Sequence, residues 1–320
     1  MRHLSLLAAA LLLCTPALGS EDVIRKGFNV SPGGTLHVTA GVGDVTVVTG
    51  GTGVAVEIVR QARGTRGEKK MAHHQIDVRQ SGNDVIIDGD LVRDADGWFG
   101  GPIFYEVKWN VRVPSRYNID VHTSGGSIKL ADIGGTVDAR TSGGDITTGR
   151  LGGEASLSTS GGDITVAGAT DDLVAKTSGG SIDVGNTEAR VEAKTSGGDI
   201  RLAKVGSSVK ARTSGGDIDI EDAMGAVDAE TSGGSISAQL SRQPQGESRL
   251  STSGGGVTVT IADGIGVELD ARASGGGVHA DVPVTVQGTQ DGDQLRGRIG
   301  AGGPALVLRS SGGGIRVKRM

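Results

Sequence analysis

Residues 141–164 read Thr-Ser-Gly-Gly-Asp-Ile-Thr-Thr-Gly-Arg-Leu-Gly-Gly-Glu-Ala-Ser-Leu-Ser-Thr-Ser-Gly-Gly-Asp-Ile. Its opening hexapeptide, Thr-Ser-Gly-Gly-Asp-Ile, returns after 18 residues. Seven copies, with Ser in place of Asp in some, keep this spacing and start at Thr123, Thr141, Thr159, Thr177, Thr195, Thr213 and Thr231. Looser copies start at Thr252, Ala273 and Ser310. A strict period of this kind indicates a protein built from repeated structural units.

Apolar residues alternate with polar ones on both sides of the glycine pair in each repeat. The positions four before, two before and five after the Thr are apolar in all seven copies: Ile119, Val137, Ala155, Leu173, Val191, Val209 and Val227; Val121, Ala139, Leu157, Ala175, Ala193, Ala211 and Ala229; Ile128, Ile146, Ile164, Ile182, Ile200, Ile218 and Ile236. A period of two is typical of strands and not of helices. Each repeat therefore supplies at least two strands.

The repeats must stack, because no single 18-residue unit can bury its own apolar face. Glycine at the corners permits either a positive φ or a close approach of neighbouring backbones. The sequence thus predicts an all-β fold, a parallel β-solenoid (β-helix) of about ten coils with 18-residue repeats, capped by an N-terminal β region. We expect a signal peptide at 1–20, the cap at 21–118, regular repeats at 119–280 and closing coils at 281–320.

The first residues have the pattern of a secretory signal. Arg2 and His3 precede an apolar run that ends near Leu13, and small residues follow. The run is too short for a transmembrane helix, which needs about 20 residues. We therefore expect export to the periplasm, the cell surface or the medium.

Cys14, the only cysteine, leaves with this leader, although acylation of Cys14 is an alternative that the preceding Leu13 disfavours. The net charge of −5 argues against nucleic acid as a partner.

The sequence offers little support for catalysis, cofactors or metal. The six histidines show no spacing that would place two ligands on one side of a strand, and no nucleophile elbow or phosphate loop is present. One column follows the glycine pair and holds Ser127, Asp145, Asp163, Ser181, Asp199, Asp217 and Ser235. We favour ordinary turn formation for these Asp side chains. The alternative is a polysaccharide-acting β-helix enzyme that uses the stacked carboxylates.

Two features are candidates for binding. The outward column just before each Thr includes Arg140, Lys176, Lys194 and Arg212, a basic strip suited to an anionic glycan. A solvated edge, neutralised by neighbours such as Glu192, is the alternative. The second feature is an aromatic loop with Trp98 and Phe99, which either binds a partner or plugs the core.

Three motifs of the chain occur together: Val111-Arg-Val-Pro114, the iterated Thr-Ser-Gly-Gly-Asp-Ile and the closing Gly297-Arg-Ile-Gly-Ala-Gly-Gly. In these motifs the chain resembles the bacterial putative-adhesin family of β-strand-repeat proteins, a domain of unknown function. The resemblance implies an envelope or surface location and an adhesion role, and it carries no catalytic residue. The leading hypothesis is therefore an exported, non-enzymatic cell-envelope structural or interaction protein. Its expected partners are an anionic glycan, an envelope or surface protein, or a second copy of the chain, with no cofactor.

Overall fold

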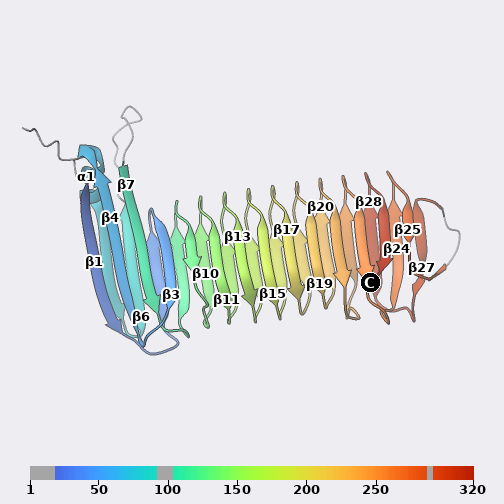
Figure 1. The fold of residues 1–320 in the computed structure, drawn as a ribbon, viewed down its shortest axis with the longest axis horizontal. Coiled ribbons are helices and arrows are strands. Elements are labelled where there is room, and N and C mark those ends of the chain that lie inside the picture. The colour runs from blue at the N-terminus through green and yellow to red at the C-terminus, as the bar shows by residue number, and fades with distance from the viewer. Residues whose placement is uncertain (1–18, 92–103, 287–290) are drawn as a thin grey trace, which may run out of the picture.

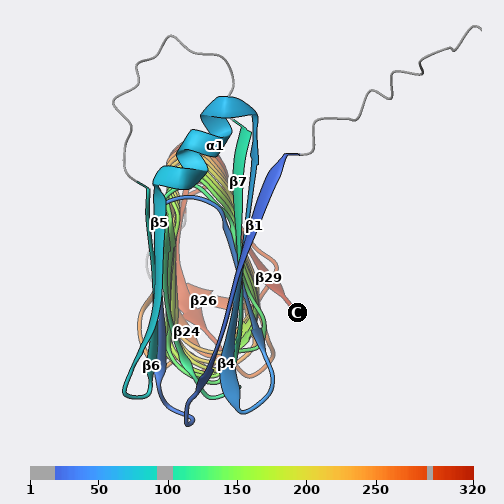
Figure 2. The same ribbon diagram turned by 90° about the vertical axis from the view of Figure 1, so that its left-hand side faces the viewer.

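The protein is a straight rod made of two long β-sheets that face each other (Figure 1). The structure is a computed structural model that describes residues 19–91, 104–286 and 291–320. Viewed along the rod, the two sheets form a flattened tube, and successive coils lie behind one another (Figure 2). The described residues form 29 strands and one helix. The predicted fold class, an all-β parallel solenoid, is confirmed.

Both sheets run the length of the rod, one strand beside the next. Sheet A holds 14 strands, in spatial order β1 (Ser20–Asn29), β4 (Gly53–Arg63), β7 (Phe104–Val113), β3 (Asp44–Thr49), β9 (Ile128–Leu130), β11 (Ile146–Leu151), β13 (Ile164–Ala169), β15 (Ile182–Thr187), β17 (Ile200–Val205), β19 (Ile218–Ala223), β21 (Ile236–Leu240), β23 (Val257–Ile261), β29 (Ile315–Arg319) and β25 (Val278–Ala280). Sheet B holds 15 strands, in spatial order β26 (Val284–Val286), β27 (Gln294–Ile299), β24 (Val267–Ala273), β28 (Ala305–Ser310), β22 (Ser248–Thr252), β20 (Val227–Thr231), β18 (Val209–Arg212), β16 (Val191–Lys194), β14 (Leu173–Lys176), β12 (Ala155–Ser158), β10 (Val137–Thr141), β8 (Asn118–Thr123), β2 (Thr35–Ala40), β6 (Asp84–Leu91) and β5 (His74–Ser81).

Each coil of the repeat contributes one strand to each sheet, in the register that the 18-residue period predicts. In sheet B, Val137 lies beside Ala155, which lies beside Leu173. In sheet A, Ile146 and Ile164 are paired in the same way, and both are fully buried. Side chains in one column therefore stack on identical or similar neighbours, and the columns together form one continuous core between the sheets.

The second glycine of each hexapeptide is required because two backbones approach closely there. A Cβ on Gly144 would lie 2.2 Å from the carbonyl oxygen of Gly126 in the preceding coil, and a Cβ on Gly162 would lie 2.2 Å from that of Gly144. The glycines with positive φ in the described chain all lie outside the seven hexapeptides. Of the two roles that the sequence allowed for these glycines, close approach is the one observed.

The buried threonine of the hexapeptide ties each corner to the corner before it. The Thr159 hydroxyl donates to the carbonyl oxygen of Gly144 at 2.8 Å and accepts from the backbone N–H of Gly162 at 3.4 Å. Thr177 repeats both contacts one coil later. The threonine side chain is largely withdrawn from water, so a polar partner is needed, and the glycine carbonyl supplies it.

The N-terminal region continues both sheets beyond the regular coils. Its strands β1, β4 and β7 extend sheet A, and β6 and β5 extend sheet B. The helix α1 (Gly64–His73), which the strand-like sequence pattern did not indicate, passes from β4 to β5 and so joins the two sheets (Figure 2). Trp109 is fully buried between them, with its indole N–H donated to the carbonyl oxygen of Val42 at 2.9 Å. The Trp109 side chain thus fills the core at this end of the rod.

The order of coils along the rod departs from the order along the chain at both ends. The coil β2–β3 lies between β6–β7 and β8–β9, although it precedes both in sequence. The last coil, β28–β29, lies between β22–β23 and β24–β25. Leu308 is consequently flanked by Leu250 on one side and Ala271 on the other. The C-terminal coil is therefore inserted one position inside the rod's end, whereas β26 and β27 lie outermost in sheet B.

Within the described part of the chain, α1 is too short and too polar to span a lipid bilayer, and no other helix is present there.

Alanine is expected to destabilise the protein at only one of the two glycines of a corner. Gly144→Ala forces a backbone shift and should lower the free energy of unfolding by about 1–3 kcal/mol. Gly143→Ala meets no atom closer than 4.0 Å and should leave stability unchanged or raise it by about 0.4–1 kcal/mol. Urea unfolding followed by circular dichroism measures both. Equal effects of the two substitutions would contradict the close-approach explanation.

The inserted coil can be tested with engineered cysteines in a Cys14→Ser background. Val307 lies directly beside Arg249, whereas Asp270 lies beyond it on the far side of β28. Adjacent strands are about 4.8 Å apart, which permits a disulfide, and a separation of about 9.6 Å does not. We expect Arg249→Cys with Val307→Cys to form a disulfide, detected by mass spectrometry, and Arg249→Cys with Asp270→Cys to remain reduced. A stack in chain order gives the opposite result.

Candidate functional site

Three of the four residues of the predicted basic strip lie side by side on the outer face of sheet B. Lys176 is paired in register with Lys194, and Lys194 with Arg212. Arg140 is separated from them because Ser158 occupies the intervening strand β12. The structure thus places a compact row of three cations near the middle of the rod, with the fourth cation apart from it.

Acidic neighbours compensate most of this strip. Arg140 forms an ion pair with Asp138 at 2.7 Å. Lys176 lies 3.7 Å from Glu192, and Arg212 contacts Asp228 at 2.9 Å and Glu230 at 3.3 Å (side-chain atoms in each case). These pairs are solvent-exposed and contribute little stability, about 0–1 kcal/mol each. In the described chain Lys194 has no ion-pair partner, so its ammonium group is the most available of the four for an external anion.

The column of Asp and Ser residues after the glycine pair forms a hydrogen-bond ladder. Asp145 Oδ1 accepts the backbone N–H of Asp163 at 2.9 Å, and Asp163 Oδ1 accepts that of Ser181 at 2.7 Å. Asp199 and Asp217 act in the same way on the coils that follow them. The predicted role was local turn formation, but each carboxylate instead bonds the backbone of the next coil, 18 residues further along the chain.

Two grooves on the described surface lack the carboxylate pair of a glycosidase. A groove of 460 Å³ beside β1, β4 and β7 is lined by Arg25, Lys26, Arg112 and a single carboxylate, that of Glu57. A second groove, of 430 Å³, also contains one carboxylate, that of Glu188. Glycosidases use a pair of carboxylates. Neither groove supplies such a pair.

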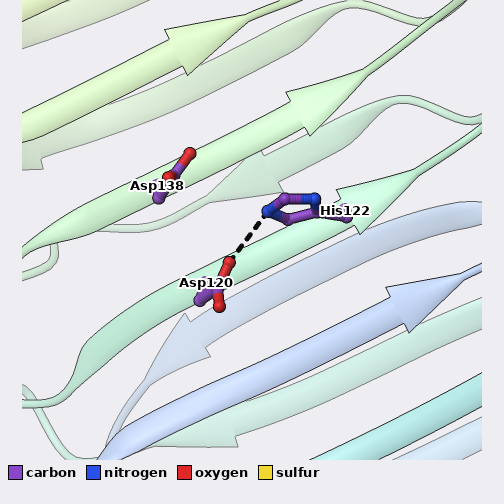
Figure 3. A group of neighbouring side chains, drawn as sticks. All are labelled: Asp120, His122 and Asp138. Atoms are coloured by element: carbon purple, nitrogen blue, oxygen red, sulfur yellow. Dashed lines mark ion pairs between the residues drawn. The ribbon is translucent and has the colours of Figure 1, made fainter.

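A group of titratable side chains that sequence reasoning missed lies on the outer face of sheet B near the N-terminal end (Figure 3). Asp120 and His122 project from β8, and Asp138 projects from the adjacent strand β10. One ligand atom from each of the three lies within 4.8 Å of the others. His37, on β2, joins the group because it is paired in register with Asp120.

Asp120 is held between the two histidines. Its Oδ2 lies 2.8 Å from His37 Nδ1, and its Oδ1 lies 2.9 Å from His122 Nε2. The signal for part of this group was present in the sequence, since Asp120 and His122 are two residues apart and therefore share a face of a strand. His37 could not be placed from the sequence, because its neighbour Asp120 is 83 residues away and the chain order of the first coils is not the spatial order.

The predicted aromatic loop with Trp98 and Phe99 lies outside the described residues. Its assignment as a binding loop or a core plug stays a prediction.

Comparisons with known proteins place the chain in a family. None of the curated proteins compared with it matches. A solved structure of a putative cell adhesion protein from Clostridium sporogenes is 11% identical, with 94% of this chain and 100% of that chain covered and a TM-score of 0.24. A putative adhesin from Bacteroides fragilis is also 11% identical, with coverage of 94% and 98% and a TM-score of 0.33. The family model described as Toastrack DUF4097 matches residues 35–318, so the chain belongs to the Toastrack family.

Proposed function

We propose that this protein is an exported cell-envelope interaction protein, adhesin-like and non-catalytic, whose rod presents stacked columns of side chains to an extended anionic glycan. The N-terminal secretory pattern supports export to the periplasm, the cell surface or the medium. No cysteine follows Cys14 in the sequence. The rod can therefore form no disulfide within itself and does not depend on one in an oxidising compartment.

The observation that carries the proposal is the in-register outer face of sheet B. Parallel strands at about 4.8 Å spacing repeat the same side-chain position on every coil. Lys176, Lys194 and Arg212 occupy one such position on three consecutive strands. A linear polymer with regularly spaced negative groups can contact these cations together, which raises its affinity through many weak contacts.

The charge balance around these cations favours a modest, salt-sensitive interaction. Glu192 and Asp228 partly neutralise the row, while Lys194 has a free ammonium group within the described surface. Exposed charges separated by more than about 8 Å are largely screened at physiological ionic strength. We therefore expect binding that weakens as salt rises, with Lys194 contributing the most.

The enzymatic alternative has no specific support. The stacked Asp side chains that such an enzyme would use accept hydrogen bonds from the next coil, as at Asp163 and Ser181. A general acid or nucleophile must reach the substrate. These carboxylates are exposed or half-buried, but Oδ1 of each is engaged at the corner of the rod, so stacking of the coils accounts for the column without catalysis.

The basic row is tested by removing its charges. We expect the triple variant Lys176→Ser, Lys194→Ser, Arg212→Ser to lose most binding to acidic polysaccharides on a glycan array, and Lys194→Ser alone to lose the largest part of it. The matched control is Lys129→Ser, Arg201→Ser, Lys204→Ser, which removes three cations from the outer face of sheet A. The control should bind normally.

Three results would contradict the proposal. Unchanged binding in the triple variant would exclude the basic row. An equal loss in the sheet A control would show that only the net charge matters. Capture of a protein instead of a glycan by the wild-type rod, unaffected by the triple variant, would exclude the glycan as the partner.

A further inference from the structure

A second group of side chains lies outside the proposed glycan surface and consists of Asp120, His122, Asp138 and His37. It lies on β2, β8 and β10, whereas the basic row lies on β14, β16 and β18. All four side chains project from the same face of sheet B, because register pairs His37 with Asp120 and Asp120 with Asp138, and His122 follows Asp120 by two residues. The strand β2 reaches this position only through its insertion between β6 and β8.

We propose that Asp120, His122 and Asp138 bind a divalent transition-metal ion, with zinc as the best fit, and that His37 positions Asp120 for it. Imidazole nitrogen together with carboxylate oxygen is a common zinc ligand set, whereas calcium and magnesium prefer oxygen alone. The three ligand atoms lie within 4.8 Å of one another. Tetrahedral zinc requires separations of about 3.4 Å, which small side-chain rotations on an exposed strand face can supply.

Asp138 has a carboxylate oxygen that is free to bind a metal ion. Its Oδ2 accepts a hydrogen bond from Arg140 at 2.7 Å, while its Oδ1 is shielded from solvent and has no hydrogen-bond partner among the described residues. A shielded oxygen without a partner is costly, and a metal ion is one partner that would satisfy it. Arg140 can remain on Oδ2 when Oδ1 binds the ion, so its ion pair does not have to break.

His37 acts through Asp120. Its Nδ1 lies 2.8 Å from Oδ2 of that carboxylate, on the opposite oxygen from the one that faces His122. Outer-shell partners of this kind orient metal ligands, and their loss typically weakens metal binding by about 10–100-fold. Three protein ligands leave at least one coordination position for water or for a donor group from a partner.

The site is tested by titrating the full-length Cys14→Ser chain, without a polyhistidine tag, with zinc chloride in a calorimeter, since a free thiol also binds zinc. We expect one zinc ion per chain. The isosteric variants Asp120→Asn and Asp138→Asn should each weaken binding at least tenfold, His122→Ala should abolish it, and His37→Ala should weaken it by about 10–100-fold. The matched control is His279→Ala, because His279 pairs with Asp281 at 2.7 Å on β25 and belongs to no such group in the described chain.

Several results would overturn the proposal. The first is no heat of binding at high micromolar zinc. The second is binding that persists unchanged in both Asp120→Asn and Asp138→Asn while circular dichroism shows the native fold. The third is an equal loss of binding in His279→Ala, which would indicate nonspecific surface histidine binding. A glycan array repeated with the Asp120→Asn variant separates the two proposals, since glycan binding should be unchanged.

Discussion

The structure depends on the close contact between glycine corners of successive coils. At Gly162 a side chain is excluded by the carbonyl oxygen of Gly144, and the same relation recurs at Gly180 and Gly198. The threonine hydroxyl bridges the same pair of corners, as Thr177 does to Gly162. Because each corner determines the position of the next corner along the rod, the 18-residue register is kept from β8 to β20 in sheet B and from β9 to β19 in sheet A. It shifts between β19 and β21, after Ile220.

This constraint divides the polar residues into two groups. Those at the corner, such as Asp145 and Asp163, form hydrogen bonds to the backbone of the following coil and so contribute to the stacking. On the outer strand faces, a side chain such as that of Lys194 is exposed and makes no such contact to the backbone of the next coil among the described residues. The outer faces of the sheets are therefore where chemistry can vary without loss of the rod, and both candidate sites lie on the outer face of sheet B.

The sequence predicted the regular coils because each buried column is local in the chain. Ile146, Ile164 and Ile182 repeat every 18 residues, and their pairing follows from the period alone. The coil order at the ends was not predictable in this way. Residues 35–49 and 305–319 carry ordinary strand patterns, and nothing in them specifies which two coils they separate.

The two candidate sites also differ in how far the sequence could predict them. The row Lys176 and Lys194 was visible as a sequence column, although the acidic side chains that neutralise it had to be located in space. The group around Asp120 was missed, because His37 arrives from an inserted coil and Asp138 from the next repeat. A search for ligands along one strand does not detect ligands that are collected across three strands.

Distances between spin labels along sheet B test the central claim, that coils stack in one register, most directly. A label at Arg140→Cys, paired in turn with labels at Glu230→Cys, Arg309→Cys and Arg272→Cys in a Cys14→Ser background, spans five, seven and eight strand spacings. The backbone separations are about 24, 34 and 38 Å, and the distances between labels from double electron–electron resonance should increase in the same steps. A separation that does not grow by about 4.8 Å per strand, or a label at position 272 nearer to 140 than the label at 309, would contradict the account.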